Sequence, residues 1–289
     1  MLFSPLTMVI FAQMSNTARQ TVVIPNLFTS FLATPPYTNP HYRSVRAESE
    51  QWLADSWQCD YKAQRKISAI DFSYFCAILA PKADRDRFRL VCDWGNWVFP
   101  FDDLFDDGHL REDTDQAVLL IERLIRAMQD GNEPGPLPAG SEAEQRLVDC
   151  HSNIWMRLKS GTENAGVRER FMCAMQDYCQ GALQQVQDCS KSHSRDPEDL
   201  LTVRRSSIGA QPLYALVEFG HQLDIPKAVF NHSLIQQIRV LGVDLILIQN
   251  DILSYRKEEV SHGKLEGPGV MNWYFETLTD YLPVRGREA

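Results

Sequence analysis

Apolar residues recur at helical spacing along almost the whole of this 289-residue chain. They return every three or four positions, which places them on one face of a helix, whereas the strict alternation of a half-buried strand is hard to find. Glycine and proline punctuate the pattern, most clearly between Gly131 and Pro138 and at Pro226. The sequence therefore predicts an all-α fold, with helices over residues 44–57, 61–79, 84–105, 113–130, 141–160, 166–190, 196–223 and 227–258.

The helical segments follow one another without an internal repeat or a clear linker. A single helical bundle is therefore the simplest architecture. We expect one α-helical domain over residues 21–289, preceded by a disordered extension over residues 1–20. The stretch from Met1 to Met14 is mildly apolar but has no basic residue, so a weak targeting signal, or a true start at Met14, is the less favoured alternative. No stretch reaches the ~18 uninterrupted apolar residues of a membrane span, so no membrane anchor is expected.

The composition narrows the possible partners and the compartment. The formal net charge is −9 and no basic run compensates it, which argues against nucleic acid as a partner. The seven cysteines are scattered and lack the paired spacing of a metal site. Such a set is typical of reduced thiols, so we expect a cytoplasmic protein. We also expect a monomer or a weak homodimer.

Four carboxylates, between Asp102 and Asp107, end an apolar stretch that begins at Trp94. Asp102 and Asp106 are four residues apart and therefore fall on one face of a helix. The simplest alternative is a solvated helix end, but a helix C-terminus already carries partial negative charge, and the cluster is unfavourable there unless cations bind. Ligand sets made only of oxygen suit Mg²⁺, so we interpret the segment as half of a metal site.

A second set of oxygen ligands lies at the end of the helix predicted over residues 227–258. Asn250, Ser254 and Glu258 drift by only about 80° over two turns of a helix. The helix before them carries two apolar stripes, formed by Leu234, Ile238, Leu241, Leu245, Ile248 and Ile252 and by Val240, Val243 and Leu247. A helix that is apolar on more than one side is buried, and its polar end then needs a metal ion or a phosphate as partner. The two segments together suggest a diphosphate held between them by several Mg²⁺ ions.

Arg204 and Arg205 stand shortly before Gly209 and Pro212, which together predict a break in the helix. An arginine side chain donates in a planar fork that matches phosphate oxygens. A broken helix at this place is suited to bind and sense a diphosphate, although an exposed arginine pair explains the two residues equally well when they are taken alone.

At these residues the chain resembles the class I terpene synthases, most closely the fungal (basidiomycete-type) sesquiterpene synthases. The segment from Asp102 to Asp106 is similar to the aspartate-rich metal motif of that family, and Asn250, Ser254 and Glu258 are similar to its Asn/Ser/Glu metal triad. The stretches Asn39 to Tyr42 and Cys92 to Phe99 also look like the family. The resemblance extends from about Ile24 to Glu259.

The resemblance implies an all-α class I terpenoid synthase bundle around a central cavity, and a Mg²⁺-dependent reaction with three ions. The implied metal ligands are Asp102, Asp106, Asn250, Ser254 and Glu258. The implied catalytic residues are Arg204 as the diphosphate sensor, with Arg205 as a close alternative, Lys257 and Tyr281. Phe99 and Trp273 join Arg204, Arg205 and Lys257 as substrate-binding residues, and Phe72, Phe75, Phe99 and Trp273 are candidates for stabilising a carbocation by cation–π attraction.

The end of the chain departs from the family pattern. The family has several dozen more residues between the metal triad and a tryptophan-containing segment that ends in an Arg-Tyr pair. Here only residues 259–271 separate the triad from Asn272 and Trp273, and Thr279-Asp280-Tyr281 stands in place of the Arg-Tyr pair. We expect residues 259–289 to be a shortened C-terminal part, which would leave the pocket more open and favour linear alcohols among any products.

Three functions are compatible with these residues. The first is a sesquiterpene synthase that ionises farnesyl diphosphate, or another prenyl diphosphate, and cyclises the carbocation with release of diphosphate. The second is a catalytically impaired relative of such an enzyme. The third, a chain-elongating prenyltransferase, normally carries two aspartate-rich motifs, and the Asn/Ser/Glu triad speaks against it.

Overall fold

The computed structural model describes residues 9–11, 21–23, 33–106, 108–129, 142–191 and 197–261, with only the backbone for the two short N-terminal segments and for residues 189–191, 197 and 252–261. The helices belong to residues 38–265, and a small hairpin belongs to a separate part of the chain. In the hairpin, β1 (Val9–Phe11) pairs antiparallel with β2 (Thr21–Val23), so that Ile10 lies opposite Val22. Strands of three residues are too short for an alternating pattern to be recognised, which is why the sequence did not indicate them. For the other residues of 1–20, disorder stays a prediction.

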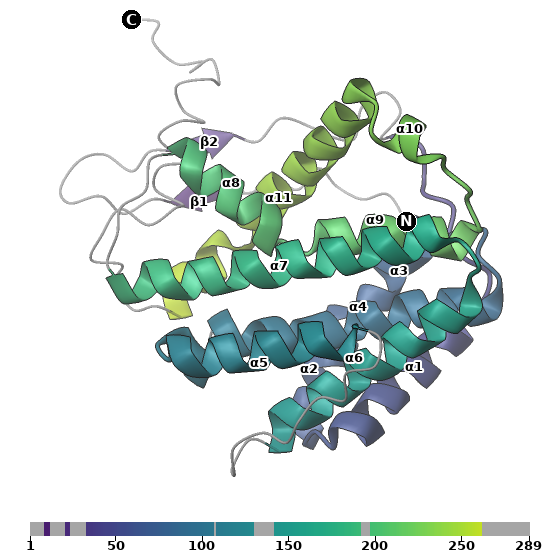
Figure 1. The fold of residues 1–289 in the computed structure, drawn as a ribbon. Helices are drawn as coiled ribbons and strands as arrows, with labels where there is room; N and C mark the ends of the chain where they lie inside the picture. The colour runs from purple at the N-terminus through teal and green to yellow at the C-terminus, as the bar shows by residue number, and fades with distance from the viewer. Residues whose placement is uncertain are drawn as a thin grey trace, which may run out of the picture. The chain divides into compact units, whose positions relative to one another are not determined.

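Within residues 38–265 the described secondary structure is entirely helical (Figure 1), which confirms the predicted all-α class. The helices are α1 (Tyr42–Trp57), α2 (Tyr61–Ile70), α3 (Phe72–Leu79), α4 (Arg85–Asp106), the short 3-10 helix η2 (His109–Arg111), α5 (Thr114–Ala127), α6 (Glu142–Gly161), α7 (Ala165–Lys191), α8 (Pro197–Ser207), α9 (Ala210–His221), α10 (Lys227–Phe230) and α11 (Ser233–Ser261).

Three of the predicted helices are each divided in two. The helix predicted over residues 227–258 is interrupted between α10 and α11. The predicted break is present at Gly209, which separates α8 from α9 with a φ of 73°. The helix predicted over residues 61–79 is also interrupted, at Asp71, whose φ is 51°. Aspartate tolerates this left-handed conformation, and here the hydroxyl of Tyr42 and the guanidinium of Arg46 donate to its carboxylate at 2.6 and 2.7 Å. Because both donors come from α1, the helical periodicity of residues 61–79 could not indicate this break.

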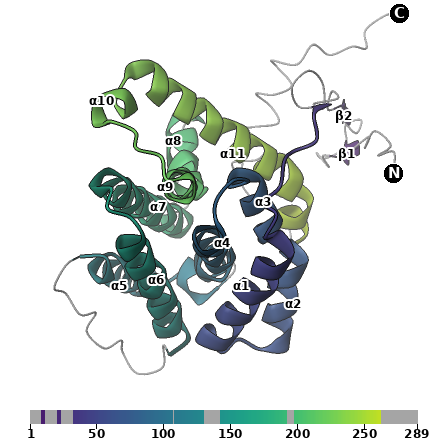
Figure 2. The ribbon, with the colours of Figure 1, turned by 90° about the vertical axis from the view of Figure 1, so that its right-hand side faces the viewer.

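Helix α4 forms the centre of the helical part. Figure 2 shows α4 nearly end on, with α1, α3, α6, α7 and α9 around it. Its side chains Phe88, Trp94, Trp97 and Phe101 are fully buried. All residues of α4 from Leu90 to Val98 are buried, so α4 is a core helix whose acidic C-terminal end is held by the surrounding bundle.

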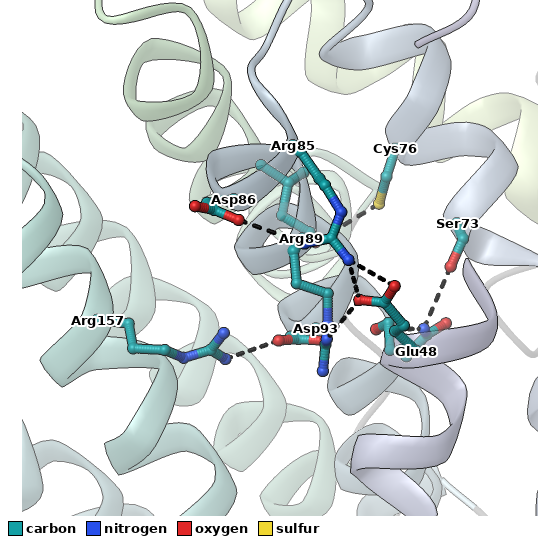
Figure 3. A network of polar contacts seen from close by, with 11 residues as sticks. Glu48, Ser73, Cys76, Arg85, Asp86, Arg89, Asp93 and Arg157 are labelled. Carbon is teal, nitrogen blue, oxygen red and sulfur yellow. Dashed lines mark hydrogen bonds and ion pairs between the residues drawn. The ribbon is translucent and has the colours of Figure 1, made fainter. Parts of the chain in front are cut away.

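A buried polar network joins α4 to the helices on both sides of it (Figure 3). The carboxylate of Asp93, which is fully buried, accepts from Arg89 on α4 and from Arg157 on α6, both at 2.7 Å. On the other side, the amide of Asn96 donates to the hydroxyls of Ser49 at 2.9 Å and Ser73 at 3.2 Å. Burial raises the pKa of Asp93, while the charges of Arg157 and Arg89 oppose that shift. Removing one partner of such a pair leaves a buried charge without compensation. The contacts of this network therefore favour one relative placement of α1, α3, α4 and α6.

Helix α11 is less buried than the sequence predicted. Its first apolar stripe is turned to solvent, because Leu234, Ile238, Leu241 and Leu245 are 59, 64, 62 and 63% exposed. In the second stripe Val243 and Leu247 are fully buried, although Val240 is 40% exposed. The prediction of a helix buried on more than one side is therefore wrong for the described part of α11. Among the described residues the helix packs against α8, α9 and α10, and the periodicity of its sequence cannot tell which face has a partner.

His151 on α6 is fully buried between two aromatic rings. Its ring centroid lies 4.7 Å from that of Trp97 and 6.1 Å from that of Phe171, and neither of its nitrogens has a hydrogen-bond partner among the described residues. Burial lowers the pKa of His151 to about 3. Because the folded-state pKa lies below the unfolded value of about 6.5, the stability contributed by this neutral side chain is present above pH 6.5 and is lost as the pH falls toward 3.

We therefore expect His151→Phe to resist acid better than the wild-type protein. Between pH 7 and pH 5 the wild type should lose about 2 kcal/mol of unfolding free energy that the variant keeps, because the unfolded variant has no imidazole to protonate. Urea unfolding at the two pH values measures the difference. His109→Phe is the matched control, since His109 is 59% exposed. The same pH dependence in wild type and His151→Phe would contradict the prediction.

None of the helices in the described part of the chain is both long enough and apolar enough to cross a membrane.

Candidate functional site

The end of α4 presents three carboxylates, each in different surroundings. The hydroxyl of Tyr178 on α7 donates to Asp102 at 2.9 Å. The ammonium of Lys66 on α2 lies 2.5 Å from Asp103. Asp106 lies one turn beyond Asp102 and is exposed. Asp102 and Asp106 therefore lie close together, as predicted, whereas Asp103 is turned toward α2.

The pKa of Asp102 is raised at this helix end. Burial raises the pKa of Asp102 to about 7, and repulsion from Asp106 adds to the effect. The hydrogen bond from Tyr178 and the charge of Arg204 act in the opposite direction without cancelling it. A carboxylate that retains its proton near neutral pH indicates a place where a bound cation would lower the free energy of the ionised form.

Arg204 and Arg205 have different partners among the described residues. The guanidinium of Arg204, on α8, is an ion-pair partner of the buried carboxylate of Asp251 on α11. Burial lowers the pKa of Arg204, but the charges of Asp251, Asp106 and Asp102 outweigh burial and raise it. Arg205 instead donates to Asp244 at 2.6 and 2.8 Å. Of the two arginines that the sequence left as alternatives, Arg204 is the one whose charge acts on the carboxylates of α4.

The close approach of α7 and α8 brings Tyr178 and Arg204 to the same region. Gly181 lies at the contact, where a Cβ atom would stand 2.6 Å from the backbone nitrogen of Ser207. The break at Gly209 follows, with the ring of Tyr178 and that of Trp94 beside it. A side chain at position 181 would force the two helices apart, so glycine at this position allows α8 to carry Arg204 toward the end of α4.

Helix α11 supplies the second predicted ligand set only in part. Asn250 is exposed, and Asp251, the next residue, is buried and paired with Arg204. The backbone is helical from Asn250 through Ser254, Lys257 and Glu258, which keeps the predicted four-residue spacing on one helix face. The side chains of Ser254, Lys257 and Glu258, and all of Trp273 and Tyr281, lie outside the described residues, so their roles stay predictions.

Three of the four aromatic residues that are candidates for stabilising a carbocation lie close together. The ring of Phe72 on α3 lies 4.9 Å from that of Phe99 on α4 and 5.0 Å from that of Phe75, measured between centroids. All three side chains are half-buried. Phe99 precedes Asp102 and Asp103 by about one helical turn and therefore lies on a neighbouring part of the same face. The predicted cavity stays a prediction. Two clefts among the described residues, of about 610 and 640 Å³, lie elsewhere and share Arg87, Ser160 and Gly161 in their linings.

The residues at this site fit Mg²⁺ by their chemistry. Their ligand atoms are carboxylate and amide oxygens, and burial together with the neighbouring Asp106 raises the pKa of Asp102, which a bound cation would oppose. In the part of the chain that the structure describes, no three His, Cys, Asp or Glu side chains are grouped so that they could hold an ion by themselves. Mg²⁺ in phosphate-processing sites is commonly bound by one or two carboxylates, waters and substrate phosphates, so such a group is not required. The identity and number of the ions stay predictions.

Comparison with known proteins identifies the family. Residues 93–266 match the model of terpene synthase family 2, C-terminal metal binding. The chain belongs to this terpene synthase family. The match begins at Asp93 in the buried network of α4 and includes the carboxylates of α4, Arg204 and the whole of α11, and it confirms the resemblance seen in the sequence.

Individual relatives agree with the family assignment. The silphinene synthase peniA of Penicillium patulum is 36% identical over 84% of this chain, and the (1R,4R,5S)-(-)-guaia-6,10(14)-diene synthase of Fusarium proliferatum is 35% identical over 83% of it. The chain spans only 66% and 61% of the lengths of these two relatives. Among solved structures, wild-type cucumene synthase has the same fold, with a TM-score of 0.65 at 21% identity, over 86% of this chain and 82% of that one.

Two residues at the site escaped the sequence analysis. Tyr178 lies on a helix whose sequence indicates only core packing, and nothing local distinguishes it from other buried tyrosines. Asp251 lies next to Asn250, but its sequence surroundings do not indicate a partner, because Arg204 is 47 positions away in the chain and on another helix. Both contacts depend on how the helices are placed in space.

The Tyr178 hydroxyl should hold Asp102 in the orientation that binds metal. We expect Tyr178→Phe to raise the Mg²⁺ concentration needed for half-maximal binding of inorganic diphosphate on the order of 10-fold, as is typical when the partner of a metal ligand is removed. Titration calorimetry at several Mg²⁺ concentrations measures this shift. Tyr42→Phe is the matched control, because Tyr42 also donates to an aspartate, Asp71, at 2.6 Å but outside this site. An equal Mg²⁺ dependence in both variants would contradict the proposed role.

Proposed function

We propose that this protein is a Mg²⁺-dependent sesquiterpene synthase that ionises farnesyl diphosphate, cyclises the resulting carbocation and releases diphosphate. The observation that supports this most directly is the meeting of three groups at one place: the carboxylates at the end of α4, the guanidinium of Arg204, and Asp251 on α11, next to Asn250. Anion-binding and cation-binding groups are thereby combined, as a substrate that carries a metal-bound diphosphate requires.

The acidic and amide side chains would bind the metal, and the basic side chains would bind the diphosphate directly. Asp102 and Asp106 would hold Mg²⁺ on the α4 side, and Asn250, Ser254 and Glu258 on the α11 side. The bound metal would supply positive charge to the oxygens of the diphosphate group. Arg204 would donate hydrogen bonds to the same oxygens, and Lys257 one turn before the end of α11 would add a further positive charge. All of these groups stabilise the charge that develops on the leaving group more than they stabilise the intact substrate.

Ionisation breaks the carbon–oxygen bond, and both electrons leave with the diphosphate. The carbon chain remains as an allylic carbocation, which needs a water-free surface of electron-rich rings. Phe99, Phe72 and Phe75 are suited to that surface, because their rings touch and lie about one turn from the carboxylates of α4. A double bond of the same chain then attacks the cation, and loss of a proton or capture of water ends the reaction.

Incubation of the purified 289-residue protein with farnesyl diphosphate and Mg²⁺ tests the proposal. We expect release of inorganic diphosphate together with hydrocarbons or alcohols of the same carbon number, detected by gas chromatography–mass spectrometry, and no release in EDTA. Adding isopentenyl diphosphate to the same reaction distinguishes the alternative activity, because a chain-elongating prenyltransferase would then form a longer diphosphate. Substrate that remains intact, although calorimetry detects its Mg²⁺-dependent binding, would identify a catalytically impaired relative instead.

A further inference from the structure

A cleft of about 640 Å³ lies at the other end of α4 from the carboxylates, between the first turns of α4, the C-terminal end of α6 and the ring of Phe219 on α9. We call it the arginine cleft, because it is lined by Arg85, Arg87, Arg89 and Arg157. Arg87 and Asp102 are about four turns, or roughly 22 Å, apart along the helix. The arginine cleft is therefore separate from the proposed metal site, and the proposed reaction gives it no role.

The described lining of the arginine cleft carries more positive than negative charge. Its four guanidinium groups are accompanied by two carboxylates, those of Asp84 and Asp86, and the side chain of Asp86 is 93% exposed. The other carboxylates that pair with these arginines, Glu48 and Asp93, are not among the lining residues (Figure 3). They hold the guanidinium groups in place, while the surface of the cleft is left suited to an anion.

The arginines keep hydrogen-bond donors that have no acceptor among the described residues. A guanidinium has five N–H groups. Arg157 donates through Nη2 to Asp93 at 2.7 Å, and its buried Nε has no partner in the described part of the chain. Arg89 donates through Nε to Asp93 and through Nη1 to Glu48, so its Nη2 is still available. Several donors from two helices can thus be offered to one group with several acceptor oxygens.

Arg87 is oriented by contacts that leave most of its donors open. Its guanidinium carbon lies 4.9 Å from the ring centre of Phe219, its Nη1 donates to the carbonyl of Phe219 at 3.4 Å, and its Nε lies 3.2 Å from the carboxylate of Asp84. A guanidinium that is stacked on a ring keeps its edges for hydrogen bonding. Asp84 also caps α4 by accepting from the backbone N–H of Arg87 at 2.9 Å, and the start of the helix adds the partial positive charge of its dipole.

A second cleft, of about 610 Å³, adjoins the arginine cleft and shares Arg87, Ser160 and Gly161 with it. Its lining includes the uncharged polar side chains of Thr162, Asn164 and Gln222 and the carboxylates of Glu163, Glu218 and Asp224. The carboxylates oppose an anion in this second cleft, whereas hydroxyl groups find both donors and acceptors there. A phosphate ion alone is also much smaller than the arginine cleft.

We propose that the arginine cleft is a second anion-binding site of this protein, which binds the phosphate group of a small phosphorylated molecule whose hydroxyl-bearing part lies in the adjoining cleft. Planar guanidinium groups match the oxygens of a phosphate, and here they come from both α4 and α6. This site needs no metal, since arginine supplies the positive charge. The proposal does not depend on the activity proposed for the other end of α4.

Titration calorimetry of the purified protein with inorganic phosphate, in EDTA and at constant ionic strength, tests the site without metal-dependent binding. Arg87→Gln should raise the dissociation constant for phosphate on the order of 10-fold, because it removes a charged donor. Arg87 is the suitable position, since it is not a partner of the buried Asp93 and its loss leaves that charge paired. Arg126→Gln on α5 is the matched control and should bind phosphate like the wild type, because Arg126 is 64% exposed and does not line the cleft.

Ser160→Glu is a second variant that keeps all four arginines. Ser160 is exposed and lines both clefts, so a carboxylate at this position should repel the anion and also raise the dissociation constant. Gln116→Glu adds the same charge at an exposed position of α5 that lines neither cleft, and should leave the affinity for phosphate unchanged. Glycerol 3-phosphate should bind more tightly than inorganic phosphate, because its hydroxyl groups reach the adjoining cleft.

A wild-type protein that binds no phosphate in EDTA would overturn the proposal, and so would an affinity that is unchanged in both Arg87→Gln and Ser160→Glu. Arg204→Lys separates the two ends of α4. Phosphate binding that is lost in Arg204→Lys but kept in Arg87→Gln would belong to the metal site, and the proposal would equally be overturned. If glycerol 3-phosphate bound no more tightly than inorganic phosphate, the role given to the adjoining cleft would be wrong.

Discussion

Asp102→Asn is expected to abolish Mg²⁺-dependent release of diphosphate and, in the absence of metal, to make the protein more stable at pH 8. The amide has no charge with which to hold a cation, but it keeps an oxygen that accepts from Tyr178. Burial and Asp106 raise the pKa of the folded Asp102 to about 7, above its unfolded value of 3.8. The folded protein therefore binds this proton more tightly than the unfolded chain, and stability is lost as the pH rises from 3.8 through 7.

Asp102→Asn should therefore be more stable than the wild type at pH 8, where the wild-type carboxyl is ionised in the unfolded chain. Because Asp102 is only half-buried, solvent reduces the effect, and we expect a gain of about 1 kcal/mol, or roughly 2–4 °C in melting temperature, at pH 8. The gain should vanish as the pH is lowered toward 4, where the wild-type carboxyl is protonated. Differential scanning calorimetry at a series of pH values, in EDTA, measures it.

Asp103→Asn is the control for this experiment. It removes a charge one residue away but also the ion pair with Lys66, so no gain in stability is expected. If Asp102→Asn released diphosphate as fast as the wild type, the end of α4 would not be the metal site. If the melting temperature of Asp102→Asn did not rise relative to Asp103→Asn at pH 8, the carboxylate of Asp102 would be better compensated than the structure indicates.

Arg204→Lys should produce the second large effect, a loss of turnover on the order of 100-fold, the size typical of removing one preorganised donor to a developing charge. The lysine keeps a positive charge beside Asp251, so the buried carboxylate retains an ion-pair partner. Lysine lacks, however, the planar guanidinium that donates to two phosphate oxygens at once. The affinity for inorganic diphosphate in the presence of Mg²⁺ should fall in parallel, which calorimetry measures independently of turnover.

Arg205→Lys is the matched comparison for this prediction. Arg205 donates twice to Asp244, so its replacement should lower the melting temperature by a few degrees, with a much smaller effect on diphosphate affinity than that of Arg204→Lys. A larger loss of affinity in Arg205→Lys than in Arg204→Lys would mean that the two arginines have been assigned in the wrong order.

The sequence was sufficient for features that depend on a few neighbouring residues. Apolar spacing of three and four residues determined the all-α class, and glycine with proline determined the break at Gly209, because both are consequences of local backbone geometry. The same holds for the carboxylates of α4 and for the spacing of Asn250, Ser254 and Glu258, since residues four apart share one face of any helix.

Contacts between helices were decided only by the tertiary structure. The ion pair of Arg204 with Asp251, the hydrogen bond from Tyr178 to Asp102 and the interruption at Asp71 each depend on groups from another helix. On α11 the pattern of the sequence is the same for a stripe that is buried and for one that is exposed, and only the position of α8 and α9 determines that Val243 faces the protein while Leu241 faces solvent. Helical periodicity is a property of one segment, whereas burial and ion pairing are properties of two segments brought together, and for that reason the sequence alone specified the helices but not which of their faces would meet.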